Sequence, residues 1–470
     1  MRFIGREKEL ESLKGLLNRG KSSLVVIRGR RRIGKSRLAE EFAKCFPTSF
    51  MLSGIPPEVG VTAQDQRNEF LRQLQEYRLP IYKADDWGDL FFELAGVCAT
   101  GPVLLLLDEI TWMGSEDKTF LPKLKTAWDR HFKKNPHLIL IISGSNSSWI
   151  SKNILSSTGF FGRISLRISL EELSLSESNA FLNKGGGRIS PFEKFKILSV
   201  TGGVPRYLEE VQMDLTAEEN LKRLCFSPDG LLFHEFDQIF HDLFLKKGAF
   251  YKEILAYLID TNLSASELAV KLKRSKGGDL SEALGQLVDV GFLARDFTWS
   301  IKTAKKSAIS RYRIRDNYLR FYLKYIRPYK EQISAGIFTH LPAGWHAIMG
   351  LQFENLVVNN WPLVAKVLSV DLDDVLLAAP FLQTPTTRRK GCQIDLLMQL
   401  RFNSLILCEV KYKQGQIGLE VIDEMSKKLD ALSLARGFSV RPVLIHVNGV
   451  DDAVVDSGFF AKIIDFSEFL

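Results

Sequence analysis

The stretch LVVIRGRRRIGKSRLAEEF at residues 24–42 decides the fold of the first part of this chain. Its apolar start predicts a short buried strand, and its end, KSRLAEEF, predicts an amphipathic helix. Between them, residues 29–36 read GRRRIGKS, a complete GxxxxGK[ST] pattern. A loop with this spacing at the start of a helix presents backbone N–H groups to a phosphate. The alternative, a basic turn that happens to contain glycines, does not explain the flanking strand and helix.

Each residue type in this loop has a chemical role in the pattern. The two glycines let the backbone wrap around a phosphate, the lysine adds a positive charge, and the serine hydroxyl ligates magnesium. We therefore expect ATP and Mg²⁺ as cofactors. The residues expected to contact the nucleotide or its metal are Gly29, Arg30, Arg31, Arg32, Ile33, Gly34, Lys35, Ser36 and Arg37.

An acidic pair completes the expected nucleotide site. Residues 103–110 read VLLLLDEI, in which four leucines make a buried strand that ends in two carboxylates. Carboxylates at the end of a buried strand destabilise the fold unless they bind a cation or a hydrogen-bond donor. Asp108 fits the magnesium carboxylate, and Glu109 fits the base that orients the attacking water. The alternative is a pair of strand-end acids that face solvent.

The pattern of apolar residues divides the chain into four parts. Near-continuous apolar runs alternate with amphipathic stretches at first, which predicts a parallel sheet covered by helices, with strands at residues 22–29, 48–54, 102–109 and 137–145. Short helical patterns follow, then three helices with two strands, then a helix with further strands. We therefore expect an α/β multidomain fold with divisions at residues 1–168, 169–242, 243–333 and 334–470.

The composition of the 470 residues is that of a soluble globular protein, with 45% hydrophobic and 25% charged residues. No apolar run approaches the roughly 18 residues that span a bilayer, and the charged start has no signal-peptide pattern. Five scattered cysteines without metal-binding spacing predict reduced thiols and a cytoplasmic protein. The net charge of +8 permits a nucleic-acid partner without requiring one.

The motifs up to about residue 240 resemble the AAA+/STAND-type ATPases called the archaeal ATPase family. They are FIGREKEL, GRRRIGKS, LLLLDEI, LILIISGSNSSWI and TGGVPRYL. By this resemblance residues 3–7 would line the adenine side, and Ser145 or Asn146 would sense the γ-phosphate. Arg163 would be an arginine finger supplied to a neighbouring subunit, which implies a homo-oligomer. The alternatives are a surface or capping arginine at 163 and a turn residue at 145.

The same resemblance implies a helical lid after the first domain. Gly203 and Pro205, in TGGVPRYL, would lie in a GxP turn of this lid close to the nucleotide. After the lid, residues 278–293 resemble the recognition helix and first wing strand of a winged-helix domain. The polar residues of that helix are mostly acidic, which suits a major groove poorly. Two roles therefore stay open for residues 243–333, an intramolecular or partner contact and DNA binding.

A basic and aromatic segment follows at residues 301–330. Phosphate contact with base stacking would explain this mixture. A helix with a solvated basic face and an aromatic core face would explain it equally well. The aromatic residues are Tyr312, Tyr318, Phe321, Tyr322, Tyr325 and Tyr329.

The last domain contains a second group of charged residues, on strands expected at residues 392–400 and 405–413. If these strands form a hairpin centred near Phe402 or Asn403, Asp395 and Glu409 face each other across it. Lys411, two residues on, lies on the same face as Glu409. Two carboxylates so close repel each other, and a divalent cation, Mg²⁺ or Mn²⁺, would relieve that repulsion.

The spacing D-x13-E-x-K resembles the core of the PD-(D/E)XK nucleases, in which the acids bind magnesium and the lysine activates water. That family adds a glutamate on the preceding helix, and GLQFENLV supplies Glu354. Ile394 stands where the family has a proline. The resemblance implies Glu354, Asp395 and Glu409 as metal ligands and Lys411 as a catalytic residue. The alternative is a cross-strand salt bridge in an inactive nuclease-like domain.

Together these motifs predict an ATPase coupled to a metal-dependent nuclease that acts on nucleic acid, with DNA as the expected substrate. The main rival is a STAND-like regulatory switch whose nuclease-like domain only binds nucleic acid or a protein partner. A third hypothesis, a transcription regulator that acts through the winged helix, is disfavoured by the acidic recognition helix.

Overall fold

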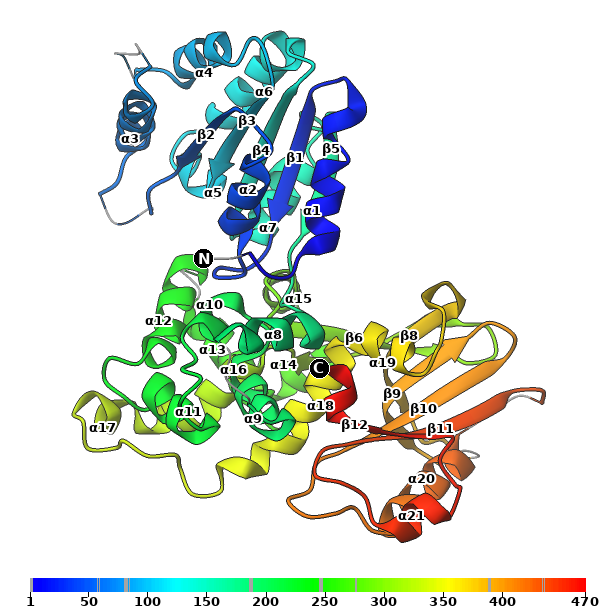
Figure 1. Ribbon diagram of the computed structural model, residues 1–470. Helices are drawn as coiled ribbons and strands as arrows, with labels where there is room; N and C mark the ends of the chain where they lie inside the picture. The colour runs from blue at the N-terminus through cyan, green and yellow to red at the C-terminus, as the bar shows by residue number, and fades with distance from the viewer. Residues whose placement is uncertain are drawn as a thin grey trace. The chain divides into compact units, whose positions relative to one another are not determined.

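The computed structural model describes residues 3–470 except 57, 59, 80–82, 84, 186–188, 245–247, 275–276, 388–389, 433 and 435. The chain forms two compact units, Met1–Glu172 and Leu173–Leu470 (Figure 1). The segments 169–242, 243–333 and 334–470 therefore lie almost entirely within one compact unit, and their division into separate domains stays a prediction. Within the described ranges, we find no helix with both the length and the apolar character needed to cross a membrane.

The first unit is built on a parallel sheet of five strands in the order β2-β3-β4-β1-β5. Alternate residues of a strand point to opposite faces, so Leu24 and Val26 join one hydrophobic core while Val25 and Ile27 join another. The four strands expected from apolar runs are confirmed; the sequence does not indicate β5, because its residues, ISLRIS, alternate apolar with polar residues and form no apolar run. The strands are β1 (Ser23–Arg28), β2 (Thr48–Ser53), β3 (Val103–Asp108), β4 (Leu138–Gly144) and β5 (Ile164–Ser169).

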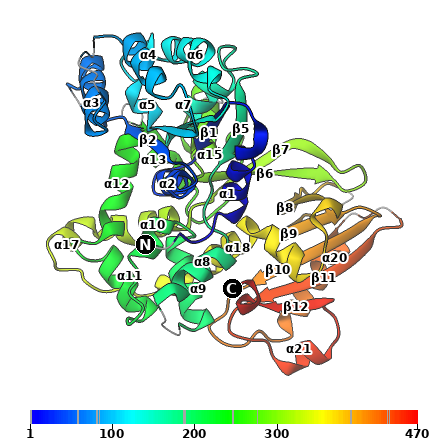
Figure 2. The ribbon, with the colours of Figure 1, turned by 45° about the horizontal axis from the view of Figure 1, so that its top comes forward.

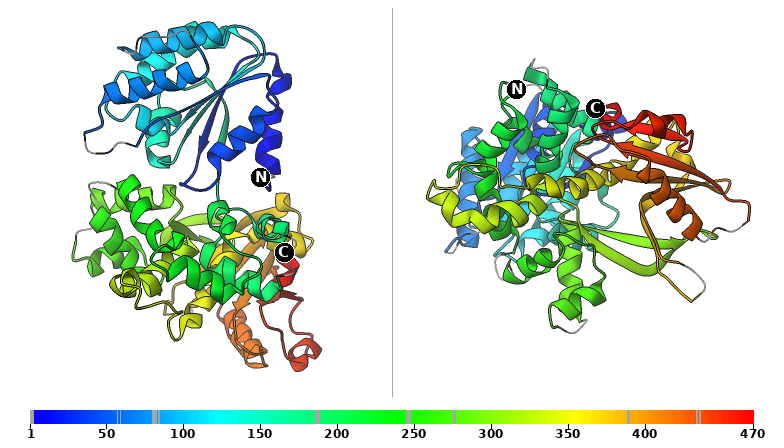
Figure 3. Two further views of the ribbon diagram at one scale, coloured as in Figure 1. Left: turned by 60° about the vertical axis from the view of Figure 1, so that its left-hand side comes forward. Right: turned by 90° about the horizontal axis from the view of Figure 1, so that it is seen from below.

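Helices cover both faces of this sheet (Figure 3). The carboxyl ends of parallel strands share one edge, so the segments that follow β1, β3 and β4 meet there. This edge carries the expected nucleotide site. The helices are α1 (Glu7–Lys14), α2 (Lys35–Ala43), α3 (Ala63–Glu76), α4 (Trp87–Val97), α5 (Ile110–Met113), α6 (Phe120–Arg130) and α7 (Ser147–Ile150).

The second unit begins with helices and an antiparallel hairpin. Side chains of Ser174, Thr216 and Ser264 cap three of these helices, each in a capping box that satisfies free backbone N–H groups. The helices are α8 (Leu175–Leu182), α9 (Pro191–Thr201), α10 (Pro205–Glu209), α11 (Ala217–Cys225), α12 (Leu231–Phe244), α13 (Gly248–Tyr257), α14 (Ala265–Lys271) and α15 (Gly278–Asp289). The hairpin strands are β6 (Leu293–Ser300) and β7 (Lys305–Ile314), paired antiparallel.

A mixed sheet in the order β12-β11-β10-β9-β8 forms the last part of the second unit. β8, β9 and β10 pair antiparallel, and β10, β11 and β12 pair parallel, with α20 connecting β10 to β11. Its strands are β8 (Val375–Gln383), β9 (Cys392–Leu400), β10 (Ser404–Lys411), β11 (Ser439–His446) and β12 (Lys462–Asp465). The helices of this part are α16 (Asn317–Phe321), α17 (Lys330–Ser334), α18 (Met349–Asn359), α19 (Trp361–Val367), α20 (Glu420–Ala431) and α21 (Asp452–Asp456).

The β6–β7 hairpin packs on this sheet beside β8 (Figure 2). The indole N–H of Trp299 donates to Oε1 of Gln399 at 2.7 Å, and Nε2 of Gln399 donates to the carbonyl of Ile301 at 2.8 Å. Trp299 also meets the ring of Phe381 edge to face. All four side chains are buried. The hairpin therefore shares a hydrophobic core with the sheet.

The basic and aromatic segment is mostly interior. Five of its aromatic residues are buried in the hydrophobic core: Tyr312, Tyr318, Phe321, Tyr322 and Tyr325. For these rings the hypothesis of base stacking is wrong, and the alternative of an aromatic face toward the core is correct.

Two arginines of that segment are buried as well, and both donate hydrogen bonds to other parts of the second unit. Nε of Arg313 donates to Oδ2 of Asp296 at 2.8 Å, and Nη2 of Arg320 donates to the carbonyl of Ile314 at 2.9 Å. Burial lowers the pKa of Arg320 to about 10. These two guanidinium groups therefore hydrogen-bond inside the second unit and are not part of a solvated basic face.

Candidate functional site

The phosphate-loop pattern runs from the end of β1 into the first turn of α2, as expected. Gly34 has φ 91°, in the left-handed region that favours glycine. A Cβ at Gly29 would lie 2.5 Å from the carbonyl oxygen of Leu170, so a side chain there would displace the loop. The two glycines of the pattern thus have distinct reasons to be glycine.

Lys35 is a buried cation of this loop, with 5% of its surface exposed. Its Nζ donates to the carbonyl of Arg30 at 3.2 Å and lies 3.8 Å from Oε1 of Glu109. Burial lowers the pKa of Lys35, while the charges of Glu109 and Asp108 oppose that shift. An anion at the loop would compensate the buried ammonium.

Asp108 ends β3 between two serine hydroxyls. Its Oδ2 accepts from Oγ of Ser36, and its Oδ1 accepts from Oγ of Ser143. A hydroxyl and a carboxylate in direct contact, both hard oxygen donors, fit a magnesium ion. The contribution of Ser143 was not expected, because it depends on β4 lying next to β3.

Glu109 directly precedes α5 and has φ 46° and ψ 47°, an unusual conformation for a non-glycine residue. Its Oε2 accepts from both the backbone N–H of Ser145, at 3.0 Å, and its Oγ, at 2.9 Å. Asn146 instead caps α7, where its side chain accepts from the N–H of Trp149 at 3.0 Å. Of the two proposed γ-phosphate sensors, Ser145 is therefore the one in contact with the acidic pair.

Arg163 forms a bidentate ion pair with Asp129 of α6. Nε and Nη2 of the guanidinium donate to the two carboxylate oxygens at 2.8 and 2.9 Å. Lys125 adds a contact at 3.0 Å, and hydrogen bonds from Arg163 lower the pKa of Asp129 to about 2. The sequence offered no signal for Asp129, which lies 34 residues earlier.

Three of the arginines expected at the nucleotide contact protein groups. Arg30 pairs with Glu172 at 3.4 Å, the guanidinium of Arg31 lies 5.6 Å from the ring centre of Trp112, and Arg37, on α2, pairs with Glu40 at 2.8 Å. Arg32 has a positive φ of 67°. Their contact with the nucleotide stays a prediction.

Arg6, in the FIGREKEL motif, hydrogen-bonds to the backbone of the phosphate loop. It is buried, and its Nη2 donates to the carbonyl of Ile33 at 3.2 Å and to the carbonyl of Glu171. The motif as a whole was expected to line the adenine side, which stays a prediction. A structural role for Arg6 was not foreseen.

Gly203 and Pro205 belong to the second unit. The N–H of Leu173 donates to the carbonyl of Gly203 at 2.8 Å, and Pro205 opens α10. A Cβ at Gly203 would lie 2.1 Å from the carbonyl oxygen of Leu173, so only glycine fits. Their proximity to the nucleotide stays a prediction.

The second group of charged residues lies on the β9–β10 hairpin. Cys408 pairs with Leu396, so the next residues along each strand, Asp395 and Glu409, are opposite each other. Oδ2 of Asp395 accepts from the N–H of Val410 at 2.9 Å. This is the register that the sequence predicted.

Two lysines contact these carboxylates. Nζ of Lys411 lies 3.2 Å from Oε1 of Glu409 and 2.6 Å from Oε2 of Glu424. Lys428 of α20, which the sequence did not suggest, bonds to Oε2 of Glu409 and lies 4.0 Å from Oδ1 of Asp395. Burial, the charge of Glu409 and that of Glu354 raise the pKa of Asp395, against the effect of Lys428.

The expected third acidic ligand does not join this pair. Among the described residues, no group of three or more His, Cys, Asp or Glu side chains is placed to hold one metal ion. Glu354, on α18, is near enough to influence the pKa of Asp395, but the expected convergence of three acids in one metal shell is wrong for this structure. Burial also raises the pKa of Glu354 itself.

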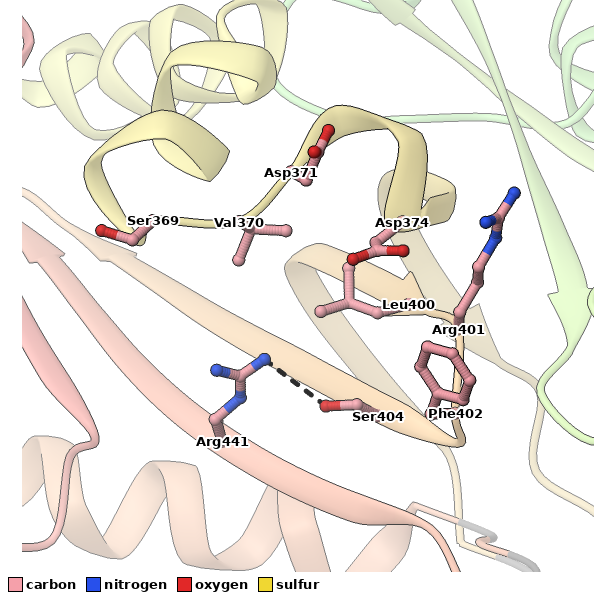
Figure 4. Close-up of a pocket in the computed structure, with 9 residues that line it drawn as sticks. All are labelled: Ser369, Val370, Asp371, Asp374, Leu400, Arg401, Phe402, Ser404 and Arg441. Atoms are coloured by element: carbon pink, nitrogen blue, oxygen red, sulfur yellow. Dashed lines mark hydrogen bonds between the residues drawn. The ribbon is translucent and has the colours of Figure 1, made fainter.

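A pocket of about 260 Å³ lies at the opposite end of the same hairpin (Figure 4). Phe402, at the turn, is 92% exposed and has φ 58°. None of the expected site residues lines this pocket. Its lining consists of Ser369, Val370, Asp371, Asp374, Leu400, Arg401, Phe402, Ser404 and Arg441.

Comparison with known proteins supports the first of these sites. Residues 21–179 match the family model described as an AAA domain. An uncharacterized protein of Methanocaldococcus jannaschii is 28% identical over 426 residues, 87% of this chain and 88% of the relative. An uncharacterized ATP-binding protein of the same organism is 42% identical over 40 residues, 8% of this chain and 68% of that protein.

Among solved structures, the fold resembles a Walker-type ATPase of Pyrococcus abyssi. The TM-score is 0.50 at 15% identity, over 68% of this chain and 96% of that one. The parallel sheet, the phosphate loop and the acid pair define a P-loop ATP-binding protein. More particularly, the match over residues 21–179 supports an AAA-type ATPase domain in that part of the chain.

Proposed function

We propose that this chain couples ATP hydrolysis to metal-dependent cleavage of nucleic acid, with DNA as the substrate. The observation that carries the second activity is the opposition of Asp395 and Glu409 across β9 and β10, with Lys411 in contact with Glu409. The resemblance to PD-(D/E)XK nucleases supports it, because the pair lies in a mixed sheet beside α18 and α20. All five cysteines are free thiols, in keeping with the proposed cytoplasmic location.

In the first unit, each residue of the nucleotide site has a proposed role. Lys35 contacts the β- and γ-phosphates, and Ser36 and Asp108 hold Mg²⁺, which neutralises phosphate charge. Glu109 orients the attacking water. Arg163 acts on the nucleotide of a neighbouring subunit, so the active ATPase is a homo-oligomer; this requires the arginine to leave Asp129.

In the second unit, Asp395 and Glu409 supply two carboxylate oxygens to a divalent cation, Mg²⁺ or Mn²⁺. Such a cation supplies Lewis acidity to a scissile phosphate and to a bound water. Lys411 stabilises the negative charge that develops on the phosphate. The hydrogen bond from Val410 keeps Asp395 turned toward Glu409.

The three helices α13 to α15 and the β6–β7 hairpin follow the element order of a winged helix. We assign this module to intramolecular contact, because its hairpin is packed on the last sheet through Trp299. The acidic outer residues of α15 support this choice over duplex reading.

The test is cleavage of plasmid, linear and single-stranded DNA with Mg²⁺ or Mn²⁺. Asp395→Asn should abolish cleavage and leave ATP hydrolysis nearly unchanged, because the acids lie in a different unit from the phosphate loop. The matched control is Asp423→Asn, an exposed carboxylate on α20, which should cleave like the unsubstituted protein. Cleavage that persists in Asp395→Asn would contradict the proposal.

The rival function is a STAND-like switch whose nuclease-like domain only binds nucleic acid or a protein. One observation favours it: both oxygens of Glu409 already have lysine partners. In that case the unsubstituted protein would bind nucleic acid or a protein partner and would cleave no DNA under any metal condition.

A further inference from the structure

Lys428 connects α20 to the two carboxylates of the hairpin. Its Nζ bonds to Oε2 of Glu409 and lies 4.0 Å from Oδ1 of Asp395. The other two oxygens are engaged elsewhere: Oδ2 of Asp395 accepts from Val410, and Oε1 of Glu409 contacts Lys411. Oδ1 of Asp395 and Oε2 of Glu409 are therefore both near the ammonium group of Lys428.

These oxygens form a donor pair that suits a hard divalent cation. Magnesium and calcium take carboxylate oxygens at roughly 2.0–2.6 Å, so the space beside Oδ1 of Asp395 and Oε2 of Glu409 would suit such an ion. The ammonium of Lys428 occupies this space. A divalent ion and an ammonium cannot share it, because like charges a few ångströms apart in a partly buried site repel strongly.

Lys428 has both the length and the room to move. Its side chain is 24% exposed, whereas that of Glu409 is 2% exposed, so the lysine is the partner with access to solvent. A lysine is a flexible chain that ends in a compact charge, and it can turn outward without moving α20. Once displaced, the ammonium needs a new anion, and a nucleic-acid substrate brings phosphates to this site.

We propose that Lys428 is a built-in counter-ion that holds the two carboxylates closed to metal until the phosphate of an incoming nucleic acid draws it away. Metal binding and substrate binding are then positively coupled, since each removes the same ion pair. This inference rests on the proposed nuclease function. It adds regulation to that site: while Lys428 pairs with the carboxylates, the protein without nucleic acid binds its divalent cation weakly.

The test measures binding of Mn²⁺ alone by the full chain, without nucleotide, from the electron paramagnetic resonance signal of the free ion. An Asp108→Asn background removes the metal carboxylate of the first unit. Lys428→Gln should bind Mn²⁺ about tenfold more tightly or better, since a positive charge has left the site. Lys427→Gln, an exposed neighbour on α20, should leave the affinity unchanged.

Two further variants keep the result interpretable. Adding Asp395→Asn to Lys428→Gln should remove the gained affinity, which locates the ion at the hairpin. Lys428→Arg retains the charge and should bind Mn²⁺ as weakly as the unsubstituted protein. Equal Mn²⁺ affinity in Lys428→Gln and the unsubstituted protein would overturn the proposal, as would an equal gain in Lys428→Arg.

The coupling has its own measurement. A single-stranded phosphorothioate oligonucleotide should raise the Mn²⁺ affinity of the unsubstituted protein and leave that of Lys428→Gln unchanged; the same response in both would overturn the coupling. If Lys428→Gln gains Mn²⁺ affinity but the unsubstituted protein cleaves nothing, the counter-ion proposal is supported and the nuclease proposal is contradicted. If the unsubstituted protein cleaves DNA but Lys428→Gln gains no Mn²⁺ affinity, the nuclease proposal is supported and the counter-ion proposal is contradicted.

Discussion

Replacing Glu109 by glutamine separates binding of ATP from its hydrolysis. The substitution keeps the shape of the side chain, and its amide oxygen can still accept from the N–H and Oγ of Ser145. It removes the negative charge that lies 3.8 Å from Nζ of Lys35. The variant therefore loses the proposed base while the loop keeps its cation.

The substitution should change ATP turnover and ATP affinity by different amounts and in different directions. A positioned general base contributes about 10²–10⁴ in rate, so turnover should fall by that factor, equivalent to about 3–5 kcal/mol of barrier. Two unit charges about 4 Å apart attract by at most about 4 kcal/mol at an effective dielectric constant of 20. Losing this attraction frees Lys35 for the phosphates. ATP affinity should therefore stay the same or increase.

The assay pairs single-turnover hydrolysis with equilibrium binding of a fluorescent ATP analogue. Lys35→Ala should show the opposite pattern, with binding lost, because it removes the buried charge of the phosphate loop. Glu116→Gln, an exposed glutamate in the same unit, is the matched control and should behave normally. Unchanged turnover in Glu109→Gln would refute the reasoning.

Two other predictions concern contacts that the tertiary structure revealed. Arg163→Ala should lose ATP turnover and keep ATP affinity, and the specific ATPase activity of the unsubstituted protein should rise with its concentration. Asp129→Asn breaks the same ion pair but retains the arginine, so this variant should stay active. Equal loss in both variants would mean that Arg163 has only a structural role. Trp299→Ala should destabilise the second unit by about 3–5 kcal/mol in urea unfolding, because it empties a buried site and leaves Gln399 without its donor. A cost below about 1 kcal/mol would show that the hairpin is not anchored.

The parts of the sites that the sequence predicted are those set by short spacings. The phosphate-loop pattern is eight consecutive residues that follow a strand and end in the first turn of a helix, so Gly29 to Ser36 could be recognised directly. The facing of Asp395 and Glu409 also followed from the sequence, because a short turn determines the register of a hairpin. Apolar runs gave β1 to β4 of the first sheet and missed β5, because its residues, ISLRIS, form no continuous apolar run.

The tertiary structure alone decided which distant side chains meet. Ser143 reaches Asp108 because β4 lies beside β3, and Asp129 reaches Arg163 from α6. A basic and aromatic segment looks alike in sequence whether it faces solvent or the core, and only packing placed Arg313 and Tyr318 inside. Lys428 lies 19 residues beyond Glu409 on a helix, and a periodic pattern gives the faces of a helix without saying what lies opposite them. The chemistry of a site follows from local sequence where its atoms share a loop or a turn, and from the packing of whole elements where they do not.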